Sequence, residues 1–83
     1  MNQAIQFPER EWWNGEQQAV CFIALVNGLQ LTCAISAGSL TVRYGQHISP
    51  LAIFQQHRWD LEDEAGDAIR NGVEDDQGWV WLF

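Results

Sequence analysis

Residues 19–36 read AVCFIALVNGLQLTCAIS, and this stretch decides the fold. Asn27-Gly28 separates two apolar runs, and both residues tolerate the positive φ that a two-residue type I′ turn requires. We therefore predict a hairpin with strands at residues 18–26 and 29–36. Because side chains alternate along a strand, one face of this hairpin is uniformly apolar and the other is mixed. The uniform face is predicted to form the core, and it carries Val20, Phe22, Ala24, Val26, Leu29, Leu31, Cys33 and Ile35.

The two cysteines lie on opposite faces of the predicted hairpin. Cys33 pairs with Phe22 on the uniform face, whereas Cys21 pairs with Ala34 on the mixed face. The sheet therefore separates the two sulfur atoms, and they cannot form a disulfide in this register. Reduced cysteines are typical of cytoplasmic proteins. Residues 1–10 lack a signal-peptide pattern, and no apolar run approaches the roughly 20 residues of a membrane helix, so we predict a cytoplasmic protein without membrane association.

The segment before the hairpin predicts a short strand and a connector. Residues 4–7 alternate between apolar and polar side chains and stop at Pro8, which is typical of an edge strand. Residues 9–16 are predicted to be a polar connector that turns at Asn14-Gly15.

Residues 37–44 fit two structures. Leu40, Val42 and Tyr44 alternate with polar residues, which favours a strand. An N-cap at Ser36 and a left-handed stop at Gly45 favour a short helix instead. Periodicity alone does not decide between them.

A long helix is predicted near residues 50–71. Ser49 is a natural N-cap, Pro50 suits the first helical position, and Asn71-Gly72 supplies the exit. The apolar residues in between form one helical stripe, which His57 and Arg58 interrupt. This stripe is expected to cover the apolar face of the hairpin, and it consists of Leu51, Phe54, Leu61, Ala65, Ala68 and Ile69.

Residues 79–83 read WVWLF and are predicted to be the closing strand of a small antiparallel sheet. Val80 and Leu82 fill the core if Trp79 and Trp81 face outward. The chain, residues 1–83, is thus predicted to be a single α+β domain, whose sheet is backed by the long helix near 50–71 and, where residues 37–44 form a helix rather than a strand, by a short helix near 37–44.

The net charge of the chain limits the classes of partner that it can bind. The formal net charge is −7, with four arginines and no lysine, which argues against nucleic-acid binding. Most carboxylates come after residue 59, where they form either a solvated helix face or a docking surface for a basic partner. We predict no cofactor and no metal site, because the chain has no glycine-rich phosphate loop, nucleophile elbow or paired cysteine motif.

Five tryptophans in 83 residues are unusual, and they have two interpretations. They enlarge a small core, or they form an exposed aromatic patch of the kind found at protein interfaces. Because so short a chain can hardly cover both faces of its sheet, we predict a homodimer through the tryptophans or the mixed face. The candidate surface for a partner or ligand comprises Trp12, Trp13, His57, Arg58, Trp59, Asp60, Trp79 and Trp81.

The leading prediction for function is a protein-interaction or self-association module without catalytic activity. The alternative is a small-molecule-binding or metal-assisted enzyme that uses His57, Arg58 and Asp60. A concave pocket on which these three side chains converge favours the alternative. A flat surface with exposed indoles favours the interaction module.

Several blocks of the sequence, taken together, resemble a family of small bacterial proteins, the domain of unknown function 1488 family. The resemblance implies an α+β fold with an antiparallel sheet backed by helices, and it favours a helix over residues 37–44. It implies no activity and no catalytic residue. The blocks are AIQFP at 4–8, the run at 19–28, CAIS at 33–36, HRWDLE at 57–62 and DDQGWVWL at 75–82.

Overall fold

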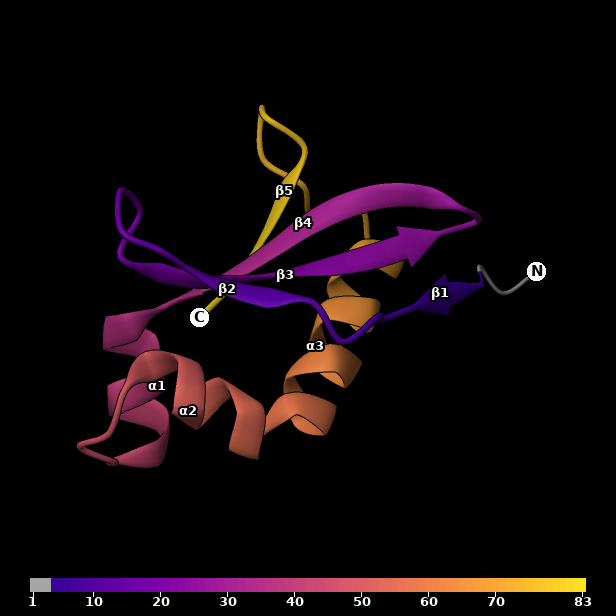
Figure 1. Cartoon of the computed structure of the whole chain (residues 1–83). Coiled ribbons are helices and arrows are strands. Elements are labelled where there is room, and N and C mark those ends of the chain that lie inside the picture. The colour runs from indigo at the N-terminus through magenta and orange to yellow at the C-terminus, as the bar shows by residue number, and fades with distance from the viewer. Residues whose placement is uncertain (1–3) are drawn as a thin grey trace.

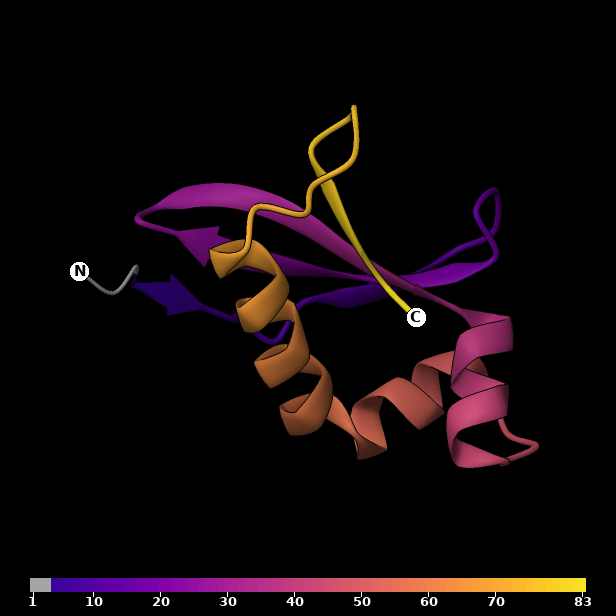
Figure 2. The ribbon, with the colours of Figure 1, turned by 180° about the vertical axis from the view of Figure 1, so that it is seen from behind.

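The computed structural model describes residues 4–83, which form a five-stranded sheet and three helices. The predicted α+β class is confirmed. All three helices lie on one side of the sheet, as Figures 1 and 2 show from opposite directions. The strands are β1 (Ile5–Gln6), β2 (Glu11–Asn14), β3 (Ala19–Val26), β4 (Leu29–Ser36) and β5 (Trp79–Leu82). The helices are α1 (Ala37–Tyr44), α2 (Pro50–Gln56) and α3 (Arg58–Arg70).

The central hairpin has the predicted register. Asn27 and Gly28 have φ values of 52° and 84°, as a type I′ turn requires. Phe22 pairs with Cys33, so the uniformly apolar face points toward the helices. Leu29, which was predicted to belong to the core, is the exception: it lies beside the turn, beyond the reach of the helices, and is 73% exposed. Both cysteines are free, and they lie on opposite faces as predicted.

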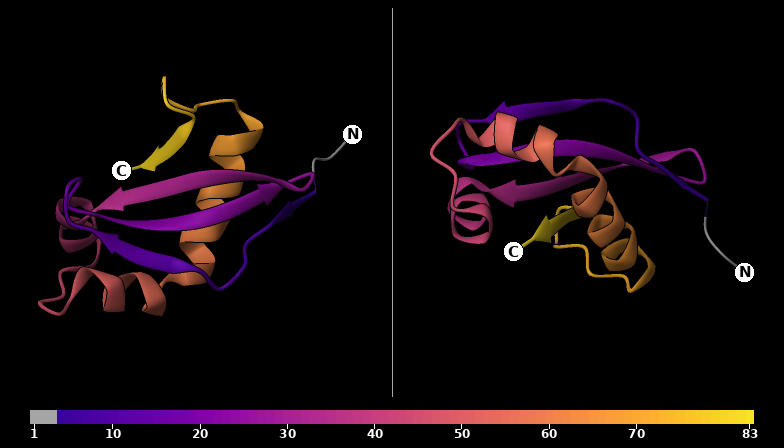
Figure 3. Two further views of the ribbon diagram at one scale, coloured as in Figure 1. Left: turned by 45° about the horizontal axis from the view of Figure 1, so that its top comes forward. Right: turned by 90° about the horizontal axis from the view of Figure 1, so that it is seen from below.

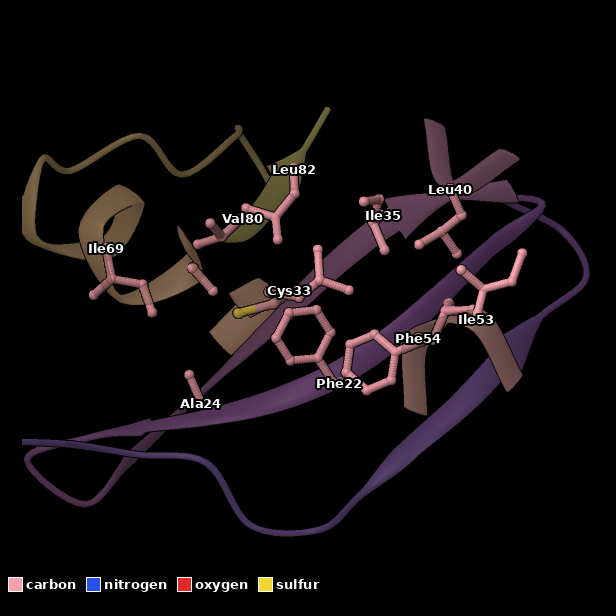
Figure 4. Packing of buried hydrophobic residues seen from close by; sticks show 13 residues of the cluster. Phe22, Ala24, Cys33, Ile35, Leu40, Ile53, Phe54, Ile69, Val80 and Leu82 are labelled. Carbon is pink, nitrogen blue, oxygen red and sulfur yellow. The ribbon is translucent and has the colours of Figure 1, made fainter. Parts of the chain in front are cut away.

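The main core fills the space between this hairpin face and the helices. The Phe22 ring packs near two other aromatic rings, with its centroid 4.8 Å from that of Phe54 of α2 and 6.3 Å from that of Phe7. Val80 and Leu82 of β5 point into the same core, as the close-up in Figure 4 shows. These two residues and the hairpin therefore share one buried interior, and the indoles of β5 are left for the opposite face.

The short helix at residues 37–44 is present as α1, and its ends follow the predicted capping. The Ser36 hydroxyl accepts a hydrogen bond from the Ser39 N–H at 3.1 Å. Gly45 has a φ of 62°, and its N–H donates to the Thr41 carbonyl at 2.8 Å. The caps satisfy backbone groups that a strand at this position would have left to a neighbouring strand.

The prediction of one long helix over residues 50–71 is wrong in one respect, because the helix is divided at His57. The backbone of His57 (φ −115°, ψ 21°) ends α2 and begins α3, and the two helices meet at an angle (Figure 3). The apolar stripe lapses at this point, since His57 and Arg58 replace the apolar residues that would keep a straight helix on the core. His57 instead stacks on Tyr44 of α1, with ring centroids 3.7 Å apart. The division lets α2 pack on β2 and β3 while α3 packs on β5.

Two further details of the predicted sheet are corrected. Residues 9–16 are not merely a connector: Glu11–Asn14 forms β2, which pairs with one end of β3 while β1 pairs with the other end. The predicted turn follows at Gly15. The pattern of Glu11–Asn14 shows no apolar alternation, so this strand depends on the free edge of β3 for its hydrogen bonds.

The last strand is parallel to its neighbour, and the sheet is therefore mixed rather than antiparallel. Trp79 pairs with Thr32, and Leu82 pairs with Ile35 in the same direction. Parallel neighbours need a long crossover, and α1, α2 and α3 provide it between β4 and β5. The alternation of residues 79–83 is equally compatible with either direction.

Candidate functional site

The predicted surface residues do not form one surface. Trp12, Trp79 and Trp81 belong to the open face of the sheet, which no helix covers. Trp13 lies on the helix face, because it pairs with Val20. The remaining four, His57, Arg58, Trp59 and Asp60, line a hollow where α2 meets α3.

Indole side chains cover small residues on the open face. The register places Trp81, Ala34, Cys21 and Trp12 in one row across β5, β4, β3 and β2. Ala34, Cys21 and the adjacent Ala19 are buried, and Trp79 and Trp81 pack against them. The two indoles lie with their centroids 5.9 Å apart and their planes 28° apart. This face is thus covered partly by its own tryptophans, each of which keeps some exposed surface.

Asp75 binds the backbone of Trp79 and the indole of Trp81. Its Oδ1 accepts hydrogen bonds from the backbone N–H groups of Gln77 and Trp79, both at 2.9 Å. Its Oδ2 accepts a hydrogen bond from Nε1 of Trp81 at 3.2 Å. The hydrogen bond from the Trp79 N–H is the largest cause of a lowered pKa at Asp75: together with the smaller contributions of Gln77 and Trp81 it outweighs desolvation, which acts in the opposite direction. Asp75 is therefore an anion that holds the loop before β5 and one indole together.

An apolar groove with a volume of about 520 Å³ runs beside β5. Two of its walls are strongly exposed apolar side chains, Val73 at 54% and Phe83 at 85% of their full accessible area. Glu64 lies at the α3 side of the groove, where its carboxylate accepts hydrogen bonds from the two terminal nitrogens of the Arg43 guanidinium at 2.9 and 2.6 Å. The complete lining is Glu64, Ala68, Val73, Asp75, Trp79, Trp81, Leu82 and Phe83.

A second, smaller hollow of about 230 Å³ shares Asp75 and both indoles with the groove. Its other walls are polar, and they come from Asp76 and Gln77 in the loop before β5 and from Gln17 in the turn before β3. This loop projects away from α1 and α2 in Figure 1. The two indoles thus stand between an apolar groove and a polar, acidic hollow.

The sequence prediction missed Val73, Asp75 and Phe83 as residues of this site. Val73 carried a detectable signal, because it is the single apolar residue between Gly72 and Gly78. An apolar residue in an acidic loop has no strand or helix stripe to join, so it either docks on the core or stays exposed. Its partners in the groove could not be identified before the direction of β5 was known.

The side chain of Arg58 is held by contacts within its own chain. Its guanidinium forms ion pairs with Glu11 of β2 and, at 3.5 Å, with Glu62, and it lies 5.2 Å from the centre of the Phe54 ring. Burial raises the pKa of Glu11, but the hydrogen bonds from Arg58 and Gln55 outweigh it, so the net shift is downward. Burial dominates at Glu62, whose pKa is raised. The positive charge of Arg58 is therefore shared between two carboxylates of its own chain.

The hollow at the α2–α3 junction has a volume of about 400 Å³ and is lined by the consecutive residues 55–60. Trp59 is its exposed aromatic wall, at 82%. His57 lies flat against Tyr44 with an angle of 5° between the rings. A single stretch of chain around a helix junction provides the whole lining, so side chains from separate elements do not converge here as they do at the groove beside β5.

Neither thiol is placed for nucleophilic chemistry. Burial, reinforced by the charge of Cys21, raises the pKa of the Cys33 thiol to about 12. Burial also raises the pKa of Cys21, against a hydrogen bond with Asn14. Within residues 4–83 no three His, Cys, Asp or Glu side chains are grouped so that they could share a metal ion. Over the same residues, no helix has both the length and the apolar character needed to span a membrane.

Comparisons with known proteins place the chain in a family. The sequence pattern of the family described as "Protein of unknown function (DUF1488)" matches residues 5–82. The proteins named "Uncharacterized protein YrdB" in Shigella flexneri and in Escherichia coli K12 are each 61% identical to this chain, over 99% of both sequences. The crystal structure of a DUF1488 protein of unknown function from Shewanella loihica PV-4 is similar with a TM-score of 0.92 and 30% identity, over 99% of this chain and 94% of that one. The chain belongs to the DUF1488 family.

Proposed function

We propose that the protein is an interaction module that binds another protein through the groove beside β5. The observation that carries this proposal is the exposure of apolar side chains around a concave site: Val73 and Phe83 project into solvent next to the partly exposed indoles of Trp79 and Trp81. Apolar side chains gathered around a concavity and rimmed by polar groups are typical of protein-binding sites.

The groove is a better candidate than the hollow at the α2–α3 junction. Aromatic and aliphatic side chains from α3, β5 and the loop between them line the groove, and Asp75 holds Trp81 in place through its indole N–H. The junction is lined by Gln55, Gln56 and charged side chains around one tryptophan. A binding site whose aromatic side chains are held in position in the free protein loses less conformational entropy on association.

Photo-cross-linking in Escherichia coli, whose own relative is 61% identical, tests the proposal. Phe83 is replaced by p-benzoylphenylalanine, and the control replaces Trp59, which is an aromatic residue of similar exposure on α3. We expect a discrete cross-linked protein from position 83 and none of the same mass from position 59. The adduct should disappear when Val73→Asp is added and persist with Val42→Asp, which places the same charge on an exposed valine of α1.

Two results would contradict the proposal. One is an absence of any discrete adduct at position 83, and the other is an adduct that Val73→Asp leaves unchanged. An adduct with twice the mass of the chain would show that the groove binds a second copy, as the homodimer prediction holds, rather than a different protein.

A further inference from the structure

The charge around the groove is unevenly compensated. Three of the four arginines are paired with carboxylates of their own chain: Arg43 with Glu64, Arg58 with Glu11 and Glu62, and Arg70 with Asp67. Glu64, the carboxylate on the α3 side of the groove, is thereby neutralised. Among residues 4–83, Arg10 is the arginine without such an ion pair, and it lies before β2.

The carboxylates on the other side of the groove have no such compensation. Glu74, Asp75 and Asp76 follow one another in the loop before β5, and none of them forms an ion pair with a cation of the described chain. Asp75 and Asp76 line the small hollow that adjoins the groove across the two indoles. An uncompensated negative potential therefore lies directly beside the apolar groove.

We infer that the occupant of the groove is a short basic segment of another polypeptide, with an apolar side chain in the groove and a lysine or arginine in the hollow beside Asp75 and Asp76. This inference rests on the proposed function and specifies the partner. The two hollows share the walls of Trp79 and Trp81, so neighbouring side chains of one segment can enter both. A cation in the small hollow meets the carboxylates of Asp75 and Asp76, and both attract it.

Two alternative occupants fit less well. A second copy of the chain also carries a net charge of −7 and pairs most of its arginines internally, so two acidic loops would repel each other. Simple addition of a strand to β5 is hindered, because the Asp75 N–H already donates to the Trp79 carbonyl at 2.8 Å along the outer edge. Side chains rather than backbone hydrogen bonds must therefore provide most of the recognition.

Nuclear magnetic resonance titration of the protein tests this inference. The probes are acetylated peptides of equal length that contain leucine with lysine, leucine with serine, leucine with glutamate, or serine with lysine. We expect the leucine–lysine peptide to shift the indole N–H signals of Trp79 and Trp81 and to leave that of the exposed Trp59 unchanged. At low salt it should bind at least about tenfold more tightly than the leucine–serine peptide, and this advantage should fall as salt is added.

Charge reversal gives a matched pair of variants. Asp76→Lys should remove the preference for the lysine-containing peptide, whereas Asp63→Lys makes the same change in net charge on α3 and should retain it. Both aspartates are exposed, and an unchanged spectrum away from the substitution verifies that each variant is folded. Retention of the full preference in Asp76→Lys would overturn the inference.

The outcomes separate the inference from the proposed function. Equal affinity for the leucine–lysine and leucine–serine peptides would contradict the inference of a basic partner, but it would still support an apolar binding groove. Indole shifts that arise on raising the protein concentration without peptide would replace the basic partner by a second copy. If no peptide shifts the indole signals of Trp79 or Trp81, the inference of a basic segment is wrong. The cross-linking experiment at position 83 then tests the proposed interaction module separately.

Discussion

The two faces of the central hairpin are buried in different ways. On the helix face, large side chains such as Phe22 and Ile35 meet large side chains from three helices, and the result is a continuous core. On the open face, Ala34 and Cys21 are small, and the indoles of the neighbouring strand lie over them. The helix face is closed by separate elements of the fold. The open face is closed by side chains that keep part of their surface exposed to solvent.

This difference predicts which substitutions should change the stability of the fold and which should change the proposed binding. Residues of the helix face contact several elements at once, so changing one of them disturbs the whole fold. Residues of the open face and of the groove beside β5 contact the sheet on one side and solvent on the other. Substitutions there should affect binding more than stability, and the following measurements test that division.

The largest effect is expected from Phe22→Ala. This variant removes a fully buried ring that packs on Phe54 and Phe7, and comparable core truncations cost about 3–5 kcal/mol of unfolding free energy. Domains of this size have total stabilities near the low end of about 5–15 kcal/mol. Urea unfolding followed by circular dichroism should therefore show that the variant is already close to its unfolding midpoint without urea. A loss below about 1 kcal/mol would remove the distinction between the faces.

Trp81→Ala should lower the free energy of unfolding by less, roughly 2 kcal/mol, because the indole is half-buried and part of its area is already exposed to solvent. The same urea titration measures it. The variant should also lose binding through the groove, which the control Trp59→Ala should retain. If Trp81→Ala destabilises the protein as much as Phe22→Ala, the open face is a second core rather than a recognition surface.

The two thiols report how readily each face opens. Cys33→Ala leaves the Cys21 thiol beneath the indoles, and Cys21→Ala leaves the Cys33 thiol beneath the helices. Alkylation of Cys21 should be at least about tenfold faster, a factor that corresponds to about 1.4 kcal/mol, because moving an indole costs less than separating helices from the sheet. The higher pKa of Cys33, about 12, contributes in the same direction.

Mass spectrometry after timed exposure to iodoacetamide measures both alkylation rates, and the unfolded variants in urea supply the intrinsic rates. Equal protection of the two thiols, after this correction, would mean that both faces open together in global unfolding.

The smallest effect concerns Asp75 and depends on pH. Its pKa is lowered in the folded protein, so the carboxylate contributes stability that is fully present above its ordinary pKa of 3.8 and is lost as the pH falls through the folded value. Wild type should therefore be more stable than Asp75→Asn near neutral pH, and the difference should shrink in acid below 3.8. Thermal unfolding of both proteins across that range gives the difference, and a gap that widens in acid would contradict the assignment.

Local patterns predicted much of this fold correctly. The Asn27-Gly28 turn sets the pairing of β3 with β4 because its geometry depends on the two turn residues themselves. Ser36 and Gly45 mark the ends of α1 in the same way, through groups a few residues apart. These features need no knowledge of distant segments.

The candidate site was predicted less completely. Trp79 and Trp81 were identified from their abundance and alternation, yet the exposed Val73 and Phe83 that complete the groove were not. His57 and Arg58 were recognised as an interruption of the helical stripe, but the pattern did not reveal that Glu11, far away in the sequence, neutralises Arg58. The Glu11 carboxylate lies within reach of Arg58 because Glu11–Asn14 pairs with β3 as a strand, and the local pattern did not predict that strand.

The sequence by itself determined the hairpin, its inward face, the helix caps and the opposite orientation of neighbouring side chains in the last strand, because each depends on backbone geometry over a few residues. The tertiary structure alone decided the parallel direction of β5, the division of the helix at His57 and the depth to which the indoles are buried. These three features depend on where the helices end relative to the sheet and on which surfaces then lie within reach of each side chain. Alternation carries no information about strand direction, and a tryptophan carries none about what will lie beneath it.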